Sequence, residues 1–351
     1  MSFLFSKIKE QQANKLPFVC YCKPNSDKII ALFQKNDDLI SLDDSDVGFA
    51  FVSFDNEKRY IIPERLSDIY FETVSASDYI FPKTMILETD SDAKIAFESL
   101  VESGVEAIQR GDFEKVVLSR KELIEVMDFD IELVFNKLIS NYSKAFKYCF
   151  YHPKIGFWIG ATPEQFLNVD ENLLKTVSLA GTQLVSNDAI KWSDKEVDEQ
   201  QIVTDYIVEN LKLYSDNVTF SEPYSHQAGN LLHIKTDIQA IVNDENAISK
   251  IINVLHPTPA VCGFPKEKAK KFIIENEGYQ REFYAGFLGE WNKDFATFKQ
   301  KRSDLFVNLR CMKIEESVAN LYIGCGITKE SNPEKEFIET VNKSLTIKSV
   351  L

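Results

Sequence analysis

Two pairs of apolar segments, each joined by a short polar turn, constrain the fold of this chain more than any other feature. In the first pair, KYCFYH and IGFWIG flank a turn at His152–Lys154. In the second pair, DLFVNLRCMKI and VANLYIGCGI flank a turn at Glu315–Ser317. Aromatic and β-branched residues favour strands, and two such runs around a short turn favour an antiparallel hairpin. We therefore expect large antiparallel sheets.

Stretches with helical periodicity separate these hairpins. Apolar residues recur at spacings of three and four over residues 93–110, 131–139 and 194–213, and the first stretch stops at Gly111. A last helix is expected from Pro333 onward. Helices set between antiparallel hairpins indicate the α+β class, here an α/β sandwich in which helices cover packed sheets.

The first quarter of the chain has a different texture. Strand-like runs at 17–21, 29–33 and 49–54 alternate with Asn-, Asp- and Ser-rich turns, and no motif there carries chemistry. We expect residues 1–90 to be a strand-rich part of the same fold, and residues 91–351 to form the catalytic domain.

Composition and charge exclude several classes of protein. With 351 residues and 44% hydrophobic content, the chain can bury a large core. Its net charge of −14 argues against nucleic acid or an anionic membrane as partner. No stretch approaches the roughly 20 apolar residues of a membrane span, and the N-terminal residues lack the apolar core of a secretion signal, so we expect a cytoplasmic protein. If the substrate is an anion, the site must create positive potential locally.

The six cysteines give no sign of a disulfide framework or a zinc site. Only Cys20 and Cys22 are close in sequence, and a one-residue gap within a strand sends their side chains to opposite faces. We expect all six to be reduced, structural thiols.

Arg310 lies in the run DLFVNLRCMKI, where strand alternation places it on the same face as Phe306 and Met312. A guanidinium on an apolar face is at least partly buried and needs an anionic partner. That partner is either one of the chain's own carboxylates or the carboxylate of a ligand, which the planar guanidinium fits well.

Three helical carboxylates could hold a metal ion. Glu199 borders the apolar face of its helix, and Glu336, Glu339 and Lys343 share one face of the last helix at spacings of three and four. Solvated side chains and a weak exposed ion pair are the simpler interpretation. Alternatively, carboxylates from two helices could bind Mg²⁺, which prefers oxygen ligands.

Two further residues could transfer protons. Lys115 begins a strand, where a lysine is either solvated or, when buried beside a cation, able to lose its proton and act as a base. Glu164 follows the strand of GATPEQF. It is either a carboxylate at a helix N-terminus, with Thr162 as cap and Pro163 in the first turn, or a general acid with a raised pKa.

Glycines and histidines add weaker signals. Gly181, Gly263, Gly324 and Gly326 either serve turns or expose backbone N–H groups that can cradle an anion. Of the four histidines, His233 and His256 are interpreted mainly as packed, hydrogen-bonding residues.

From about Asp112 to the C-terminus, the chain resembles the chorismate-utilising enzymes, which include isochorismate, salicylate, anthranilate and aminodeoxychorismate synthases. The resemblance rests on ordered blocks at compatible spacing, among them KVVLSR, GATPEQFL, SLAGT, LLHIKT, LHPTPAVCGFP, ENEGYQREFYAG, NLRCMKI, IGCGIT and NPEKEFIETVNK. It implies a two-lobed fold with large antiparallel sheets packed together, helices outside and the site in the cleft between them.

The resemblance also implies roles for the candidate residues. Lys115 matches the general base and Glu164 the general acid. Glu199 and Glu339 match carboxylates that bind Mg²⁺, and Glu336 assists through water. The positions that match substrate-binding groups are Gly181, Thr182, His233, Thr236, Arg310, Gly324 and Lys343.

Two positions favour isochorismate as the product. Ala180 stands where aminodeoxychorismate synthases of the common type have a lysine, and Lys115 stands where anthranilate synthases lack one. The expectation is that Lys115 activates a water that attacks C2 of chorismate, while Glu164 protonates the departing C4 hydroxyl. A salicylate synthase, which goes on to eliminate pyruvate, and a non-catalytic chorismate-binding subunit are the alternatives.

The sequence departs from the family pattern beside the Glu199 position. Gln200 replaces the histidine and Val197 the basic residue that the family commonly has, which puts metal affinity and substrate register in question. A monomer is the expected state, and the product would feed menaquinone or siderophore synthesis.

Overall fold

The computed structural model describes residues 3–351 except 75–89, 186–189, 229–230 and 245–246, and it leaves out the side chains of residues 182, 184, 195, 228 and 231. Within this part, the strands form two sheets in which all pairs are antiparallel. The two sheets confirm the expected α+β class and the prediction of large antiparallel sheets.

The first sheet has nine described strands. Their order across the sheet is β15 (Gly263–Phe264), β7 (Lys115–Glu125), β19 (Val318–Ile327), β18 (Cys311–Glu315), β9 (Gly156–Thr162), β8 (Phe146–His152), β1 (Phe18–Cys22), β2 (Lys28–Gln34) and β6 (Ser67–Thr73). The expected hairpin of β8 and β9 is present, in the register Cys149 opposite Ile159.

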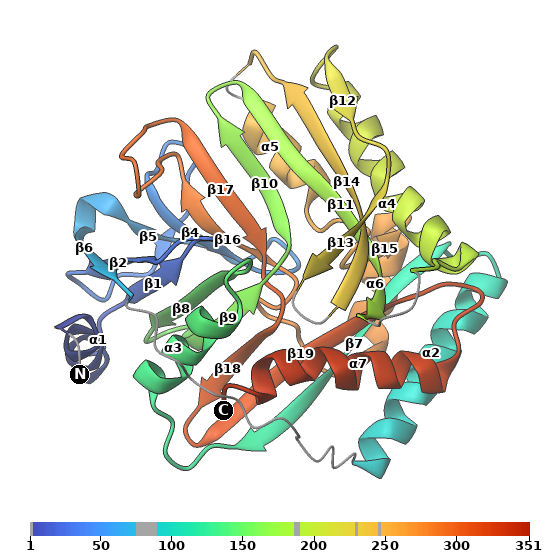
Figure 1. Ribbon diagram of the computed structural model, residues 1–351, viewed down its shortest axis with the longest axis horizontal. Helices are drawn as coiled ribbons and strands as arrows, with labels where there is room; N and C mark the ends of the chain where they lie inside the picture. Colours follow the sequence, from blue (N-terminus) through green and yellow to red (C-terminus); the bar gives the residue numbers. More distant parts are fainter. Residues whose placement is uncertain (1–2, 75–89, 186–189, 229–230, 245–246) are drawn as a thin grey trace.

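The second sheet is built in the same way. Its order is β12 (Val218–Phe220), β14 (Leu231–Ile241), β11 (Leu173–Leu184), β10 (Gln165–Asp170), β17 (Arg302–Val307), β16 (Phe287–Trp291), β4 (Gly48–Val52), β5 (Arg59–Pro63) and β3 (Ile40–Ser41), and β13 (Tyr224–Ala228) also pairs with β14. Strands from residues 1–90 therefore enter both sheets (Figure 1).

Helices cover the outer faces (Figure 1). They are α1 (Phe3–Ala13), α2 (Ser91–Gln109), α3 (Ile131–Asn141), α4 (Asp194–Lys212), α5 (Ala247–Leu255), α6 (Lys266–Asn276) and α7 (Pro333–Lys348), with a 3-10 turn at Glu64–Leu66. Helices α2 and α7 pack on β7 and β19, and α4 packs on β11 and β14. Helix α1 was not predicted, and it buries Leu4, Phe5 and Ile8 against the first sheet.

Local capping fixes where the key helices begin. The Asn332 side chain accepts a hydrogen bond from the backbone N–H of Lys335 at the start of α7, with Pro333 in the first turn. At the start of α4, Ser193 and Glu196 form a capping box. Both helices supply candidate site residues, so these caps fix where Glu199 and Glu339 lie along their helices.

The prediction of one continuous strand over residues 304–314 is wrong. The chain leaves the second sheet after Val307, crosses Asn308–Arg310 and enters the first sheet as β18. Arg310 adopts a left-handed backbone with φ of 48°, which strand geometry excludes. The buried Asn308 side chain fixes the crossing, because it accepts a hydrogen bond from Tyr148 Oη at 2.6 Å and donates one to the Phe283 carbonyl at 2.9 Å.

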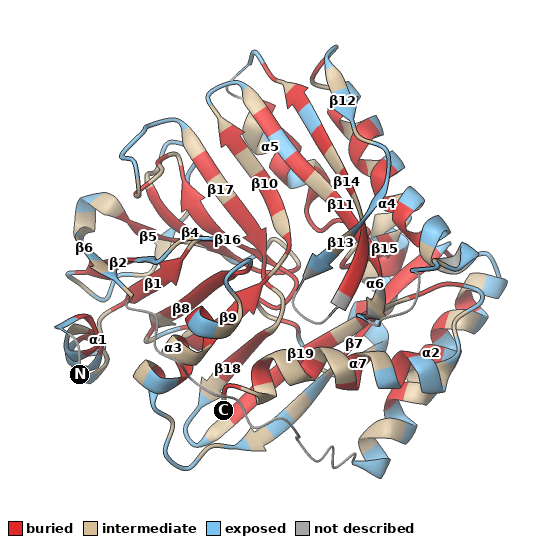
Figure 2. Cartoon of the chain, viewed as in Figure 1, coloured by how far each residue is buried: buried red, intermediate tan, exposed pale blue. Residues whose placement is uncertain are grey.

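The main core lies between the two sheets, where the strands are almost entirely buried (Figure 2). Phe51 of β4 stacks on Phe150 of β8, with ring centroids 4.2 Å apart, and on Phe283 at 4.3 Å. This aromatic stack joins the sheets. No helix among the described residues is long and apolar enough to cross a membrane.

The stack gives a test of the fold. Phe51→Ala removes a fully buried ring that contacts both sheets, so we expect the free energy of unfolding to fall by about 3–5 kcal/mol. Urea denaturation measures this change. Leu123→Ala on β7, where the side chain is 62% exposed, serves as the control and should cost far less. Equal losses in the two variants would contradict the proposed inter-sheet core.

Candidate active site

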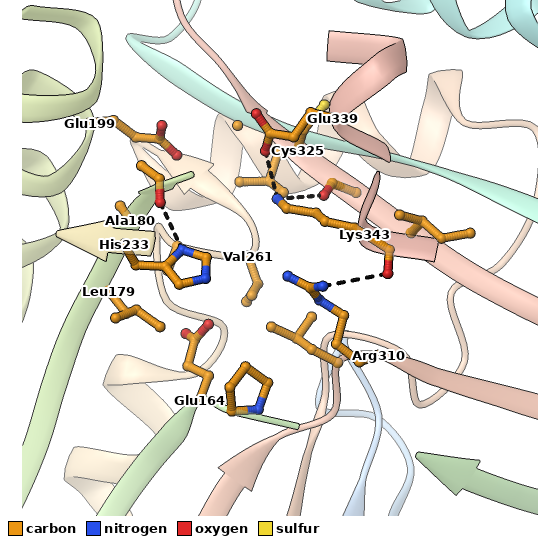
Figure 3. A pocket seen from close by; sticks show the side chains of 18 of the residues that line it. Glu164, Leu179, Ala180, Glu199, His233, Val261, Arg310, Cys325, Glu339 and Lys343 are labelled. Carbon is orange, nitrogen blue, oxygen red and sulfur yellow. Dashed lines mark hydrogen bonds and ion pairs between the residues drawn. The ribbon is translucent and has the colours of Figure 1, made fainter. Parts of the chain in front are cut away.

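One cavity brings most of the candidate residues together between the two sheets. Its walls come from β7, β11, β14 and β19, from helices α4 and α7, and from the two crossings at 163–164 and 309–310. Of the predicted site residues, those that line it are Glu164, Gly181, Glu199, His233, Arg310, Gly324, Glu339 and Lys343 (Figure 3).

Glu164 lies on the two-residue link by which the chain passes from β9 in one sheet to β10 in the other. The link does not begin a helix, so the interpretation of Glu164 as a helix N-terminal carboxylate is wrong. Its backbone carbonyl accepts a hydrogen bond from the Val307 N–H at 3.0 Å, and its neighbour Gln165 donates to Asp304 at 2.7 Å. These bonds hold Glu164 next to the crossing at Asn308–Arg310.

Burial raises the pKa of Glu164 to about 7, against the opposing effect of the positive charges on Lys115, Lys343 and Arg310. The carboxyl is only 8% exposed, so its ionised form loses most of its hydration. A carboxyl with this pKa is partly protonated near neutral pH. It can therefore give a proton to a leaving group.

Lys115 lies behind the cavity wall and forms an ion pair with Glu199. Its Nζ is 3.0 Å from Glu199 Oε1, and the lysine is fully buried. Lys115 is not among the residues that line the cavity, whereas Glu199 is. The solvated strand-edge interpretation of Lys115 is therefore wrong, and Glu199 lies between the amine and the cavity.

Gly326 makes room for this pair. A Cβ at residue 326 would overlap Glu199 Oε1 and would lie 3.3 Å from Lys115 Cε. The glycine on β19 thus lets a carboxylate from α4 and an amine from β7 meet, which gives a physical reason for a residue that the sequence marked only as a possible cradle.

Lys343 and Glu339 form the second charged pair, one turn apart on α7. Lys343 Nζ is 2.7 Å from Glu339 Oε1 and donates to the Gly324 carbonyl at 3.1 Å. Figure 3 shows this chain of contacts beside Arg310. The side chains of Glu339 and Lys343 are only 24% and 15% exposed, so the pair is not the freely solvated one that the spacing alone suggests.

Arg310 has no carboxylate partner among the described residues. Its Nη1 donates to the Lys343 carbonyl at 3.4 Å and to Thr346 Oγ1 at 3.2 Å. Burial lowers the pKa of the guanidinium, although nearby Tyr284 and Glu339 oppose this effect. A half-buried cation bonded to neutral oxygens can accept an anion in the cavity.

His233 is neutral. Its Nδ1 is 2.8 Å from the Gly181 carbonyl, and burial together with the charge of Arg310 lowers the pKa of the imidazole to about 3. Gly181 has φ of 70°, a conformation that an L side chain rarely adopts. The predicted Thr182 contact lies outside the described side chains.

Thr236 and Gln200 lie behind the wall. Gln200 Nε2 donates to Thr236 Oγ1 at 2.8 Å and to Thr204 Oγ1 at 2.9 Å, which ties α4 to β14 next to Glu199. Thr236 does not line the cavity. Gln200 therefore supports the neighbouring carboxylate from within the core.

The three predicted metal carboxylates do not form a preassembled site. Within the described residues, no three His, Cys, Asp or Glu side chains converge. Glu336 is buried one turn before Glu339 but does not line the cavity. Glu199 and Glu339 both do, and each is paired with a lysine. Glu199 and Glu339 thus supply two carboxylates in one cavity, which is the type of ligand that a hard divalent cation prefers.

Tyr284 and Tyr322 belong to the cavity wall, but they were not singled out in the sequence. Their rings stack with centroids 5.5 Å apart. Tyr284 lies inside the block ENEGYQREFYAG, and Tyr322 directly precedes the block IGCGIT. In the sequence, an aromatic residue in or beside such a block was the signal that could have pointed to the cavity wall.

Comparison with known proteins identifies the family. The sequence model described as chorismate binding enzyme matches residues 56–351. The chain belongs to the chorismate-binding enzyme family. The family therefore accounts for most of the chain, including all of the cavity wall.

Curated relatives of this chorismate-binding enzyme share 28% identity with it. The salicylate biosynthesis isochorismate synthase of Pseudomonas aeruginosa matches over 265 residues, which are 73% of this chain and 54% of that protein. Isochorismate synthases MenF and EntC of Escherichia coli match 74% and 72% of this chain, and 60% and 66% of their own lengths. The chain thus matches between half and two thirds of the length of these relatives.

Solved structures confirm the fold. The Bacillus anthracis protein DhbC, named as a 2,3-dihydroxybenzoate-specific isochorismate synthase, superimposes with a TM-score of 0.79 at 23% identity and 99% coverage of both chains. The menaquinone-specific isochorismate synthase MenF of Escherichia coli gives 0.78 at 21% identity, covering 95% of this chain and 88% of its own. Anthranilate synthase component I of Streptococcus pneumoniae gives 0.65 at 18% identity, with coverage of 94% and 89%.

The contact at Gly326 gives a test of the site geometry. Gly326→Ala should cost about 1–3 kcal/mol of stability, because the new methyl group displaces Glu199. In a Glu199→Ala background, the same glycine substitution should cost clearly less. Thermal unfolding of the four proteins in this double-mutant cycle measures the coupling. Strict additivity would show that Gly326 and Glu199 do not touch.

Proposed function

We propose that this chain is an isochorismate synthase, which converts chorismate to isochorismate with the help of Mg²⁺. The observation that carries the proposal is one cavity between the sheets in which a carboxyl with a pKa of about 7 lies with two cationic side chains, Arg310 and Lys343. Chorismate carries two carboxylates, and these cations offset them in a chain of net charge −14.

Glu164 is the proposed general acid. In its protonated form it donates to the C4 hydroxyl as that group leaves, and burial keeps it protonated up to about neutral pH. Arg310 holds one substrate carboxylate, and its place on the crossing bonded to Glu164 fixes the substrate relative to the acid. The neutral His233 and the backbone at Gly181 and Gly324 complete the wall, with Thr236 behind it, and Thr182 next to Gly181 is a further proposed contact.

Lys115 is the proposed base that removes a proton from the water attacking C2. A charged Lys115 cannot accept a proton, so this role requires Glu199 to turn from the lysine to another cation. Glu199 and Glu339 would hold Mg²⁺, with Glu336 acting through water. The ion would supply positive charge for the ring carboxylate of the substrate.

The product assay tests the proposal. Purified protein given chorismate and Mg²⁺ should form isochorismate, and fluorescent salicylate should appear only after an isochorismate pyruvate lyase is added. EDTA should abolish turnover, and Lys115→Ala should reduce it by at least about 100-fold. Salicylate formed without the lyase would favour the salicylate synthase alternative, and absence of any chorismate turnover would refute the proposed activity.

The role of Glu164 predicts a pH profile. A general acid works in its protonated form, so kcat should fall by up to tenfold per pH unit as pH rises above about 7. Glu164→Gln should lose at least about 100-fold in kcat. Glu290 is a matched control: burial raises its pKa to about 7 as well, but it lies outside the cavity, so Glu290→Gln should keep turnover.

Stability measurements separate loss of the acid from loss of the fold. In the folded protein, the pKa of Glu164 lies above its ordinary value of 4.5, because burial disfavours the ionised carboxyl. The buried protonated carboxyl therefore supports the fold at low pH, and this stability is lost as pH rises from about 4.5 through 7. Glu164→Gln removes this loss, so the midpoint temperature of the variant relative to the unsubstituted protein should rise between pH 5 and pH 8. The account would be contradicted if the midpoint temperature of Glu164→Gln, relative to the unsubstituted protein, fell between pH 5 and pH 8.

A further inference from the structure

A second cavity adjoins the active site. Its lining residues are Asn141, Tyr142, Ser143, Lys144, Ala145, Ala161, Pro163, His226, Gln227, His233, Arg310 and Thr346. Three of these, Pro163, His233 and Arg310, also line the active-site cavity, and none of the other described cavities shares a wall residue with the active site. Arg310 and His233 therefore form a thin partition between the two spaces.

The second cavity has an exposed mouth. Ser143, Lys144 and Gln227 are exposed, while Ala145 and Ala161 further in are buried. Every described residue that lines the active-site cavity is buried or half-buried. The shared residues Pro163, His233 and Arg310 are therefore the part of the active-site wall that borders a cavity with an exposed mouth.

The charge of the second cavity suits an anion. Its described lining contains two cationic side chains, Lys144 and Arg310, and no Asp or Glu, although the chain as a whole carries 54 acidic residues. The other described surface cavities each include carboxylates, such as Glu122, Asp198 and Glu171. Asn141 Nδ2 is buried without a hydrogen-bond partner in the described part, so it is available as a donor to an oxygen ligand.

We propose that this second cavity is the passage through which the dianionic substrate enters the active site, drawn in by Lys144 and handed to Arg310. The inference rests on the proposed function for the identity of the anion. A cavity of one sign with low-dielectric walls concentrates ions of the opposite sign and speeds their association. Arg310 suits the inner end of the passage, because it lines both cavities and its hydrogen bonds to Lys343 and Thr346 are long.

The test measures how fast chorismate associates and dissociates. Stopped-flow tryptophan fluorescence can follow binding, since Trp158 stacks on the cavity residue Tyr322 with centroids 5.3 Å apart. The measurement uses the full chain in the Glu164→Gln background with Mg²⁺, where turnover should be too slow to interfere with the binding signal. Conversion of chorismate by the unsubstituted protein is assayed separately.

Lys144→Glu reverses the charge at the mouth of the passage. We expect the association rate constant to fall by about fivefold to tenfold at low ionic strength, and the difference to shrink in 0.5 M salt. Lys154→Glu makes the same change at the other end of the β8–β9 hairpin, roughly 20 Å away by strand length. It should leave association within about twofold of the unsubstituted rate.

Ser143→Trp partly fills the mouth with a bulky side chain at an exposed position, with Ser143→Ala as its control. Blocking a passage slows entry and exit by the same factor, so the association and dissociation rate constants should fall together while Kd stays within about twofold. A changed Kd at an unchanged association rate would show instead that the cavity is part of the binding site.

The outcomes separate the two claims. Equal association rates for Lys144→Glu and Lys154→Glu, in a protein that converts chorismate, would overturn the passage and leave the proposed function standing. If the unsubstituted protein neither binds nor converts chorismate, the proposed function fails, and the passage proposal fails with it.

Discussion

Two crossings of the chain between the sheets, bonded to each other, are the constraint on which the site depends. β9 and β18 are neighbours in the first sheet, and β10 and β17 are neighbours in the second. The links between them run side by side, because the Val307 N–H donates to the Glu164 carbonyl and the Ala161 N–H donates to the Arg310 carbonyl, each at 3.0 Å. A buried acid and a half-buried cation are thereby fixed on two neighbouring, hydrogen-bonded links.

The electrostatics of the cavity follow from this placement. The sheets bury Glu164, Lys115 and Glu199 in a region with little water, where each charge acts strongly on the others. The pKa of Glu164 rises because hydration is lost, even though three cations oppose the shift. A chain with a large negative net charge thus places two cationic side chains, Arg310 and Lys343, on the cavity wall, where an anionic ligand can contact them.

Two carboxylates of the cavity wall, Glu199 and Glu339, are each paired with a lysine in the described structure. Lys115 pairs with Glu199, and Lys343 pairs with Glu339. Such pairs keep buried charges compensated, and they place two carboxylates from different helices on one wall. A divalent cation held by Glu199 and Glu339 would compensate the two carboxylates that the lysines compensate in this structure.

The sequence by itself determined the class of fold, most element positions and the candidate side chains. Hairpin and helix periodicity are local properties. Gly181 has a left-handed backbone, and Gly326 lies where a side chain would overlap Glu199. The continuous strand through Arg310 was predicted wrongly, because alternation cannot show that a buried Asn308 bends the chain from one sheet to the other. Only the tertiary structure showed that Lys115 lies behind Glu199 and that Glu164 does not begin a helix. It also showed that a second cavity adjoins the first. These features depend on contacts between residues far apart in the chain, which no local pattern encodes.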